Sequence, residues 1–265
     1  MNILIPILAV AVIGLICGVG LSVASAVMKV EEDERLPLIR ECLPGANCGA
    51  CGFSGCDGYA AALLDPETKI NLCVPGGAST VKQLSEVLGV AAEAAEAKVA
   101  VVKCSGTCEH TSPRAEYHGI PSCKAAKVYY GGGGSCIFGC IGYGDCAKVC
   151  PNDAISYNNG IAAINAEKCI GCGLCAKECP QKVIAIVPAS AKAGVFCSSP
   201  EKGAVTRKAC SAGCIGCKKC EKTCENGAIT VVDNLARIDY AKCTGCGACA
   251  EACPTGSLKL RDLTA

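Results

Sequence analysis

The chain has no tryptophan, and aromatic residues make up only 4% of its 265 positions. It therefore lacks most of the bulky side chains that usually fill a large hydrophobic core. It also lacks a charge imbalance, because it has 25 basic and 24 acidic residues and a net charge of +1. This balance excludes the basic footprint of a nucleic-acid-binding protein.

Two kinds of catalytic motif are missing as well. No Gly-x-Gly-x-x-Gly opens a helix after a strand, so no NAD or FAD site is predicted. The four glycines at 131–134 are expected to form a flexible turn. The only two histidines, His110 and His118, are expected at the surface, and no nucleophile–base arrangement is visible. We therefore expect no bond-making chemistry in this chain.

Cysteine, in contrast, is abundant, with 27 residues in the chain. A disulfide scaffold is disfavoured because the number is odd, the chain is long and the cysteines recur two or three residues apart. Such spacing is typical of thiolates that converge on a metal centre. Bound metal would then contribute to the stability that aromatic side chains do not supply.

The N-terminus is apolar, without a charged side chain from Ile3 to Met28. These 26 residues exceed the roughly 20 that cross a hydrocarbon core. A cleaved signal peptide is the alternative, since Ala24-Ser25-Ala26 resembles a cleavage site, but no basic segment precedes the apolar run. We predict a single transmembrane helix over 1–29.

The basic residues near this segment all follow it, namely Lys29, Arg35 and Arg40. The positive-inside tendency then places the rest of the chain on the cytoplasmic side of the cell membrane. A reducing compartment also suits a chain rich in free thiols.

A first cysteine module follows, in which Cys48, Cys51, Cys56 and Cys73 have the spacing Cys-x2-Cys-x4-Cys-x16-Cys. Its glycines let the backbone wrap closely around a cluster, which predicts a 4Fe–4S site. A four-cysteine zinc site is the alternative. Next we expect a helix over 57–64, a second helix capped by Ser79 or Thr80 that reaches about Lys98, and a strand over 99–102.

The remainder of the chain is a duplication with an offset of 74 residues. The offset relates Cys123, Cys136, Cys140, Cys146, Cys150, Cys169, Cys172, Cys175 and Cys179 to Cys197, Cys210, Cys214, Cys220, Cys224, Cys243, Cys246, Cys249 and Cys253. Prolines follow Cys179 and Cys253, as in ferredoxin ligand runs. The pattern predicts two two-cluster ferredoxin-like units in tandem.

In such a unit three cysteines of one run bind one cluster, and the fourth crosses to the other cluster. In the second unit the sets are Cys214, Cys217, Cys220 with Cys253, and Cys243, Cys246, Cys249 with Cys224. Glu225 stands where proline usually follows, which alters only the turn. In the first unit Cys169, Cys172 and Cys175 join Cys150.

The other cluster of the first unit has Cys140, Cys146 and Cys179, but Tyr143 stands at the position that matches Cys217. A phenolate replaces a thiolate poorly on iron. We hypothesise that Cys136 supplies the missing ligand.

A further cluster is expected from Cys104, Cys108 and Cys123, completed by Cys197 or Cys210. Alternatively, Cys123 and Cys136 both serve this cluster, and a cysteine of the second unit fills the gap at Tyr143. Beyond Cys73 there are 21 cysteines, enough for five clusters with one over, so we expect about six 4Fe–4S clusters in all. Cys17 and Cys42 have no companions at ligand spacing.

The expected fold class is α+β, with a transmembrane helix, a small 4Fe–4S module and tandem ferredoxin-like domains. The expected boundaries are 1–29 for the helix, 30–78 for the module, 79–135 for a helical spacer with additional cysteines, 136–190 for unit 1 and 191–265 for unit 2.

This combination resembles the B component of the Rnf complex, a membrane-bound, ion-translocating ferredoxin:NAD oxidoreductase. The resemblance rests on the N-terminal apolar span, the Leu43–Gly52 module and the tandem ferredoxin runs. It implies a translocase subunit that accepts electrons from reduced ferredoxin and relays them toward membrane subunits. It also implies that flavin and NAD chemistry occur in partner chains.

Two other functions are compatible with parts of the pattern. The Cys48 module also resembles the cluster domain of corrinoid iron–sulfur proteins, but no room remains for a cobalamin domain. A polyferredoxin that feeds another membrane oxidoreductase, such as a hydrogenase, is the main alternative, and a zinc-holding interaction module is a more distant one.

Overall fold

A computed structural model describes residues 4–27, 33–91, 96–129 and 131–260. Its N-terminal part is helical, with α1 (Leu4–Val27), α2 (Arg35–Cys42), α3 (Cys56–Ala62) and α4 (Gly77–Leu88). Unit 1 contains β1 (Lys98–Val102), α5 (Cys123–Val128), α6 (Asp145–Lys148), β2 (Ile155–Asn158), β3 (Ile161–Ile164), α7 (Leu174–Glu178) and β4 (Ile184–Pro188). Unit 2 contains β5 (Ala193–Val195), α8 (Gly203–Ala209), α9 (Lys219–Thr223), β6 (Ile229–Val232), β7 (Leu235–Ile238), α10 (Ala248–Glu251) and β8 (Leu258–Leu260).

The structure corrects the prediction for the N-terminus. None of the helices in the described parts of the chain combines the length and hydropathy that a membrane span demands. The transmembrane helix predicted over 1–29 is therefore wrong, and the structure gives no support to a single-pass topology; 1–3 and 28–29 lie outside the described residues.

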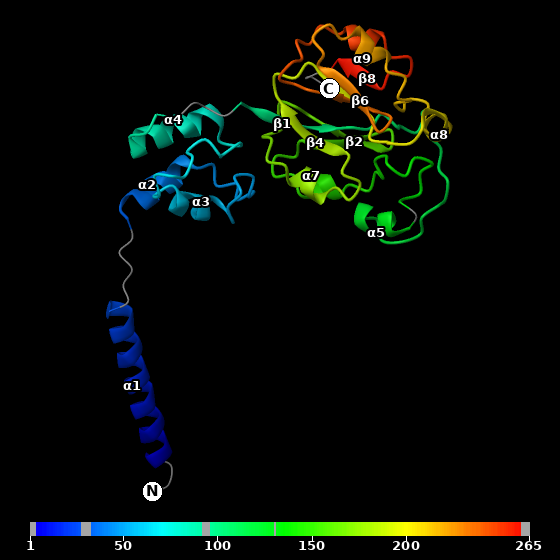
Figure 1. Ribbon diagram of the computed structural model, residues 1–265. Coiled ribbons are helices and arrows are strands. Elements are labelled where there is room, and N and C mark those ends of the chain that lie inside the picture. Colours follow the sequence, from blue (N-terminus) through cyan, green and yellow to red (C-terminus); the bar gives the residue numbers. More distant parts are fainter. Residues whose placement is uncertain (1–3, 28–32, 92–95, 130, 261–265) are drawn as a thin grey trace.

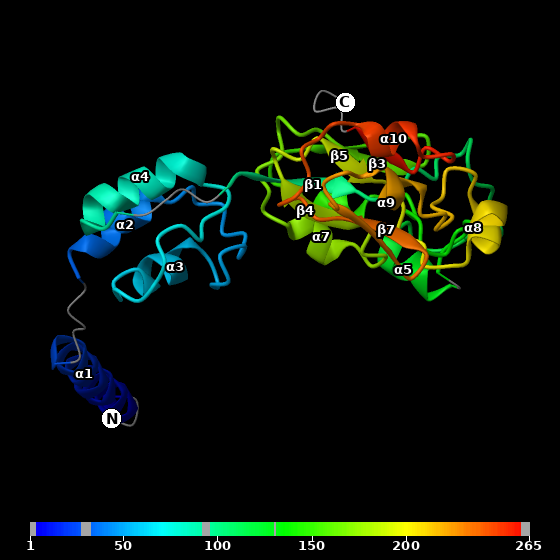
Figure 2. The same cartoon turned by 45° about the horizontal axis from the view of Figure 1, so that its top comes forward.

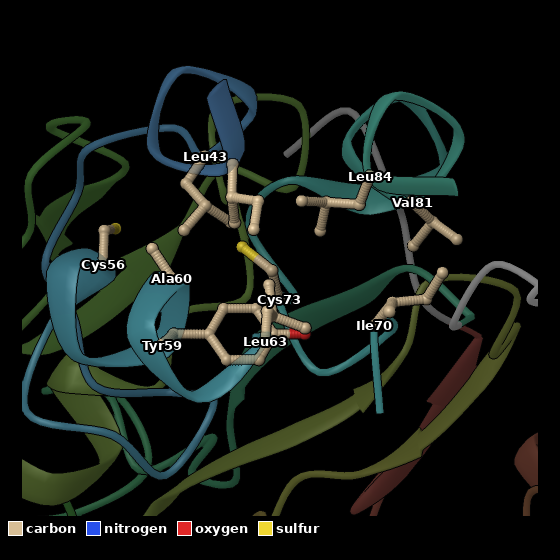
Figure 3. Close-up of a cluster of buried hydrophobic side chains, with 10 residues drawn as sticks. Leu43, Cys56, Tyr59, Ala60, Leu63, Ile70, Cys73, Val81 and Leu84 are labelled. Atoms are coloured by element: carbon tan, nitrogen blue, oxygen red, sulfur yellow. The ribbon is translucent and has the colours of Figure 1, made fainter. Parts of the chain in front are cut away.

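Residues 33–91 form a small helical body, which we call the N-terminal module. Its core is built around Tyr59 and Leu84, which are completely buried together with Ile39, and Cys73 lies among them (Figure 3). The hydroxyl of Tyr59 donates to the carbonyl of Lys69 at 2.8 Å, which anchors the loop that leads to Cys73. The cysteine-bearing loops are thus held by a compact apolar centre.

Helix α4 belongs to this module and is shorter than predicted. It begins at Gly77 and ends at Leu88, where Gly89 adopts a left-handed conformation (φ 67°) that terminates the helix. Thr80 does not cap it, because its hydroxyl donates to the carbonyl of Cys42 at 3.2 Å and so packs α4 against α2. The predicted continuation of the helix to Lys98 is wrong. Residues 89–91 are not helical and Lys98 begins β1, while 92–95 lie outside the described residues.

The 74-residue offset is visible in the backbone. In unit 1, β2 and β3 pair with Ile155 opposite Ile164, and in unit 2 β6 and β7 pair with Ile229 opposite Ile238. Helices α6 and α7 of unit 1 correspond to α9 and α10 of unit 2, and β4 corresponds to β8. The two units therefore have the same local architecture, and the α+β content and the tandem repeat of the predicted fold are present.

Each unit also pairs its last strand with a strand that precedes its cysteine runs. Strand β1 lies antiparallel to β4, with Val102 opposite Ile184, and β5 lies antiparallel to β8, with Val195 opposite Leu258. The predicted strand near 99–102 is confirmed, but it lies in the sheet of unit 1 and not in a separate spacer. Figures 1 and 2 show the two units packed side by side, with the N-terminal module next to unit 1.

Gly171 provides a test of how tightly this arrangement is packed. It has a φ of +67°, and a Cβ there would lie 2.3 Å from the carbonyl oxygen of Lys98 in β1. Gly173, in the same loop, has a φ of +75°, but a Cβ there would meet only Ile186 at 3.8 Å. Both alanine variants share the left-handed strain, so they differ in the steric clash.

We expect Gly171→Ala to lower the free energy of unfolding by about 1–3 kcal/mol more than Gly173→Ala, the usual cost of overpacking. Thermal or denaturant unfolding of the two purified variants measures the difference. Equal stabilities would show that β1 is not held as closely as the structure indicates.

Candidate iron–sulfur centres

Four cysteine loops share one backbone conformation. The second and fourth residues after Cys140, Cys169, Cys214 and Cys243 all have positive φ. These residues are Gly142 and Gly144, Gly171 and Gly173, Gly216 and Lys218, and Gly245 and Gly247. Alternating left-handed residues curl the chain so that its cysteines converge from one side. Lys218 is the only residue among these eight that is not glycine, at a φ of 59°.

The first group of four cysteines lies in unit 1. Cys150, Cys169, Cys172 and Cys175 line one cavity of about 340 Å³. The Sγ of Cys150 accepts the N–H of Ala154 at 3.3 Å, and the Sγ of Cys169 accepts the N–H of Ala100 in β1 at 3.4 Å. Burial, followed by the neighbouring thiols of Cys169 and Cys172, raises the pKa of Cys175 to about 12. The group matches the set predicted from the sequence.

Unit 2 repeats this arrangement. Around Cys224 the N–H of Ala228 donates to Sγ at 3.3 Å, as Ala154 does to Cys150. Burial raises the pKa of Cys249, and the nearby thiols of Cys243, Cys246 and Cys224 raise it further. The other predicted set, Cys214, Cys217, Cys220 and Cys253, lines a cavity of about 300 Å³.

Cys253 has an environment of its own. Burial would raise the pKa of its thiol, but hydrogen bonds from Ser257 and the N–H of Leu258 outweigh burial and lower the pKa to about 7. The Oγ of Ser257 lies 3.4 Å from the Cys253 Sγ, and Ser257 is only 1% exposed. Val183 stands at the corresponding place in unit 1, so the hydroxyl is particular to unit 2.

In the structure Cys123, and not Cys136, lies at the gap in unit 1. The cavity that holds Cys140, Cys146 and Cys179, about 370 Å³, is also lined by Cys123, whereas neither Cys136 nor Tyr143 lines it. Tyr143 instead packs against Tyr117, with ring centroids 5.8 Å apart. Burial raises the pKa of Cys146, and the thiols of Cys123 and Cys179 are among the groups that raise it further.

Helix α5 brings Cys123 to this place. Cys123 is its first residue, and the buried carboxylate of Asp145 accepts hydrogen bonds from the Ser122 hydroxyl at 2.7 Å and the Lys124 N–H at 3.1 Å. These bonds fasten the start of α5 to the ligand loop of unit 1. The sequence places Cys123 with Cys104 and Cys108, whereas in the structure it lies beside Cys140, Cys146 and Cys179.

In the N-terminal module the four predicted cysteines also come together. Burial raises the pKa of Cys73, and the thiols of Cys56, Cys48 and Cys51 raise it further. The side chain of Asn47, at a φ of 44°, accepts the N–H of Cys56 at 2.8 Å and so closes the loop.

This module faces unit 1 through its cysteines. The thiol of Cys48 is near enough to raise the pKa of Cys172, after burial as the main cause. A Cβ on Gly171 would lie 3.3 Å from the side chain of Val74, next to Cys73. The ligand loops of the two bodies are therefore direct neighbours.

The remaining cysteines separate into one group and a few isolated residues. Cys104, Cys136, Cys197 and Cys210, together with Cys140 of the neighbouring set, line a cavity of about 480 Å³ between the units. Cys108, which the sequence assigned to a cluster, is exposed and lies against Gly160. His110 contacts the hydroxyl of Ser211 at 2.9 Å, and His118 lies exposed beside Glu116.

These groups can be tested against the shape of an iron–sulfur cluster. Within the described residues, no three His, Cys, Asp or Glu side chains gather closely enough to hold a single metal ion. A cubane cluster requires a wider arrangement, because its four thiolates bind four different irons at its corners. The four-cysteine cavities, with backbone N–H groups directed at the sulfurs, fit that requirement.

Comparisons with protein families agree with this division of the chain. Residues 43–75 match an Fe–S cluster family, and residues 135–183 and 213–257 both match the 4Fe-4S dicluster domain. Beyond Cys73 the matched ranges leave out Cys104, Cys108, Cys123, Cys197 and Cys210. These five cysteines are therefore an addition to the recognised domains.

Curated relatives cover nearly the whole chain. It is 44% identical over 241 residues to the B component of the Na(+)-translocating ferredoxin:NAD(+) oxidoreductase complex of Acetobacterium woodii, covering 91% of this chain and 72% of that protein. It is 46% identical over 242 residues to the proton-translocating counterpart of Clostridium ljungdahlii, covering 90% and 85%. For the B component of the ion-translocating oxidoreductase complex of Methanosarcina acetivorans the identity is 39% over 231 residues, covering 87% and 88%. The chain belongs to the family of B components of the ion-translocating ferredoxin:NAD(+) oxidoreductase complexes, known as Rnf.

Proposed function

We propose that the chain is the electron-relay subunit of an ion-translocating ferredoxin:NAD(+) oxidoreductase. It takes electrons from reduced ferredoxin and passes them through 4Fe–4S clusters to other subunits of the complex. The observation that carries this proposal is the recurrence of four-cysteine groups in unit 2, in unit 1 and in the N-terminal module, with the ligand loops of unit 1 and of the module as neighbours. The family membership supports the identity of the donor and of the complex.

An iron–sulfur cluster, once bound, supplies one-electron transfer in which no substrate bond is made or broken. The chain contributes the ligands and their surroundings. We assign five sets of four: Cys48, Cys51, Cys56 and Cys73; Cys123, Cys140, Cys146 and Cys179; Cys150, Cys169, Cys172 and Cys175; Cys214, Cys217, Cys220 and Cys253; and Cys224, Cys243, Cys246 and Cys249.

The charge distribution supports entry of electrons at unit 2. Exposed basic residues lie in or next to helices α8 and α9, on either side of the exposed Cys217 in the sequence. They are Lys202, Arg207, Lys208, Lys218, Lys219 and Lys222. Such a surface steers an acidic protein donor toward the cluster held beside it. The N-terminal module, at the other end of the row, is then the exit.

Two features support association with a membrane complex on its cytoplasmic side. Helix α1 leaves large apolar side chains exposed, including Ile5 (70%) and Leu21 (72%), and such a surface marks a site for partner subunits. Thiolate-ligated clusters are best preserved in a reducing compartment. Flavin and NAD chemistry belong to the partner subunits.

The function is tested by interrupting the exit. In the purified complex we expect Cys51→Ala to abolish NAD(+) reduction while reduced ferredoxin still reduces the remaining clusters of this chain. Cys42→Ala is the matched control, since Cys42 is on the neighbouring helix α2 but outside the ligand set. Continued NAD(+) reduction in Cys51→Ala would contradict the proposed order, and copurified nickel in place of a flavoprotein would identify a hydrogenase polyferredoxin.

The role of Cys123 is tested by iron analysis. We expect Cys123→Ala to lose one cluster, or about four irons per chain, because it removes the fourth thiolate of its set. Cys108→Ala is expected to keep its full iron content, since Cys108 lies outside every four-cysteine group. Iron loss in Cys108→Ala as well as in Cys123→Ala would support the sequence-based assignment, in which both residues bind the further cluster. Full iron content in Cys123→Ala would exclude Cys123 from every set.

The hydroxyl of Ser257 is expected to raise the reduction potential of the cluster that Cys253 holds. A hydrogen bond to sulfur stabilises the more negative, reduced state. We expect Ser257→Ala to shift this potential by about 40 mV to more negative values, which corresponds to the loss of a hydrogen bond of about 1 kcal/mol. EPR-monitored redox titration measures the shift, and the other clusters serve as internal controls. An unchanged potential would exclude this role.

A further inference from the structure

One cysteine loop of unit 2 is open where its counterpart in unit 1 is covered. The loops 169–173 and 243–247 are equivalent in the repeat and share their pattern of positive φ. Cys172, in the first loop, is only 9% exposed, whereas Cys246, at the same place in the second loop, is exposed. Because the two loops have the same backbone, the difference must come from what lies against them.

The N-terminal module is what covers the loop of unit 1. A Cβ on Gly171 would lie 3.3 Å from the side chain of Val74 in the module. The thiol of Cys48 lies near Cys172 and contributes, after burial, to the raised pKa of that cysteine. Figures 1 and 2 show the module next to unit 1. This face of unit 1 is thus the seat of a small body that brings a cysteine loop of its own.

The open face of unit 2 has the same framework. A Cβ on Gly173 would meet Ile186 of β4 at 3.8 Å, and a Cβ on Gly247 would meet Leu260 of β8 at 3.3 Å. Ile186 is half-buried, but Leu260 is 54% exposed. Unit 2 therefore presents an aliphatic side chain directly beside the exposed cysteine loop.

The charge that touches this open loop is basic. A Cβ on Gly245 would lie 2.8 Å from the side chain of Lys192, which is exposed. Lys242 is also exposed and lies 3.8 Å from the carboxylate of Asp239, and Glu251 follows on α10. An aliphatic centre with a lysine at its edge is complementary to an acidic protein surface that has an apolar middle.

We propose that the Cys246 loop, with Leu260 and Lys192 on its two sides, is a docking surface for a second molecule of reduced, acidic ferredoxin. The repeat supplies the argument for this occupant, because the equivalent face of unit 1 holds a small module that matches an Fe–S cluster family. The proposal rests on the electron-relay function proposed above and adds a second place where the donor binds.

This surface is separate from the basic surface of α8 and α9. Cys217 and Cys246 belong to the two different ligand sets of unit 2, and they are the exposed cysteines among the five proposed sets in the described residues. At each surface one electron leaves a reduced donor and is accepted by the oxidised set beside it, with no proton or bond change. Reduction of NAD(+) takes two electrons, so two surfaces let one chain collect both without an exchange of donors.

The surface is tested with Leu260→Glu in the full chain, purified anaerobically with its clusters. The probe is a two-cluster 4Fe–4S ferredoxin, titrated at low ionic strength and followed by calorimetry. We expect about two ferredoxins to bind to the unmodified chain and about one to Leu260→Glu, because the new carboxylate repels an acidic surface and replaces an apolar contact. Iron content should be unchanged in this variant.

Two further variants complete the design. Val128→Glu is the matched control, since Val128 is an exposed apolar residue (88%) on α5 of unit 1, and it should still bind about two ferredoxins. Lys192→Glu acts from the other side of the loop and decides the question if Leu260→Glu loses iron. We expect it to weaken the second binding event by about tenfold, the loss of one well-placed interface contact.

The outcomes separate this inference from the function that underlies it. Binding of a single ferredoxin, weakened by Lys219→Glu near Cys217 and by neither Leu260→Glu nor Lys192→Glu, would overturn the second surface and leave the relay function intact. An equal loss in Leu260→Glu and Val128→Glu would also overturn it, because the effect would then be one of general charge. Failure of reduced ferredoxin to bind to or reduce the unmodified chain would instead overturn the proposed function.

Discussion

The geometry of a cubane cluster is the constraint on which the structure depends. Four thiolates must surround a small cavity, yet a local cysteine run supplies only three of them. The fourth must come from another segment, so each set ties together distant parts of the chain. Cys150 and Cys253 would be such fourth ligands within a unit. Cys123, at the start of α5, would be the fourth ligand beside Cys140, and Cys73 would be the fourth ligand in the N-terminal module.

This constraint explains how a chain with so few aromatic residues is organised. Its hydrophobic centres are small, and the cysteines are part of them: Cys146 and Cys175 lie with Val183 in unit 1, and Cys214 and Cys249 lie with Leu258 in unit 2. Only the N-terminal module has a core centred on an aromatic ring, that of Tyr59, among the cores in the described residues. Elsewhere metal–thiolate bonds would supply stability that side-chain packing does not.

The relative placement of the groups decides what they can do together. Cysteines of one set lie next to cysteines of the following set. The thiol of Cys48 in the N-terminal module is near Cys172 of unit 1, and the N–H of Cys140 in unit 1 donates to the Sγ of Cys104. Backbone N–H groups and, at Cys253, a buried hydroxyl then differentiate sites that have identical ligands. An electron relay needs both properties, close spacing and graded potentials.

The sequence by itself determined the cofactor class, the tandem repeat and the family, and it predicted the ligand sets of the regular runs. These depend on local spacing, which a cysteine run or a repeated hairpin carries wherever it lies in space. Only the tertiary structure decided that Cys123 lies beside Cys140, Cys146 and Cys179, that β1 pairs with β4 of unit 1, and that Cys104, Cys136, Cys197 and Cys210 meet between the units. These facts depend on hydrogen bonds between distant segments, such as those of Asp145 and Ser198, and no spacing along the chain encodes them.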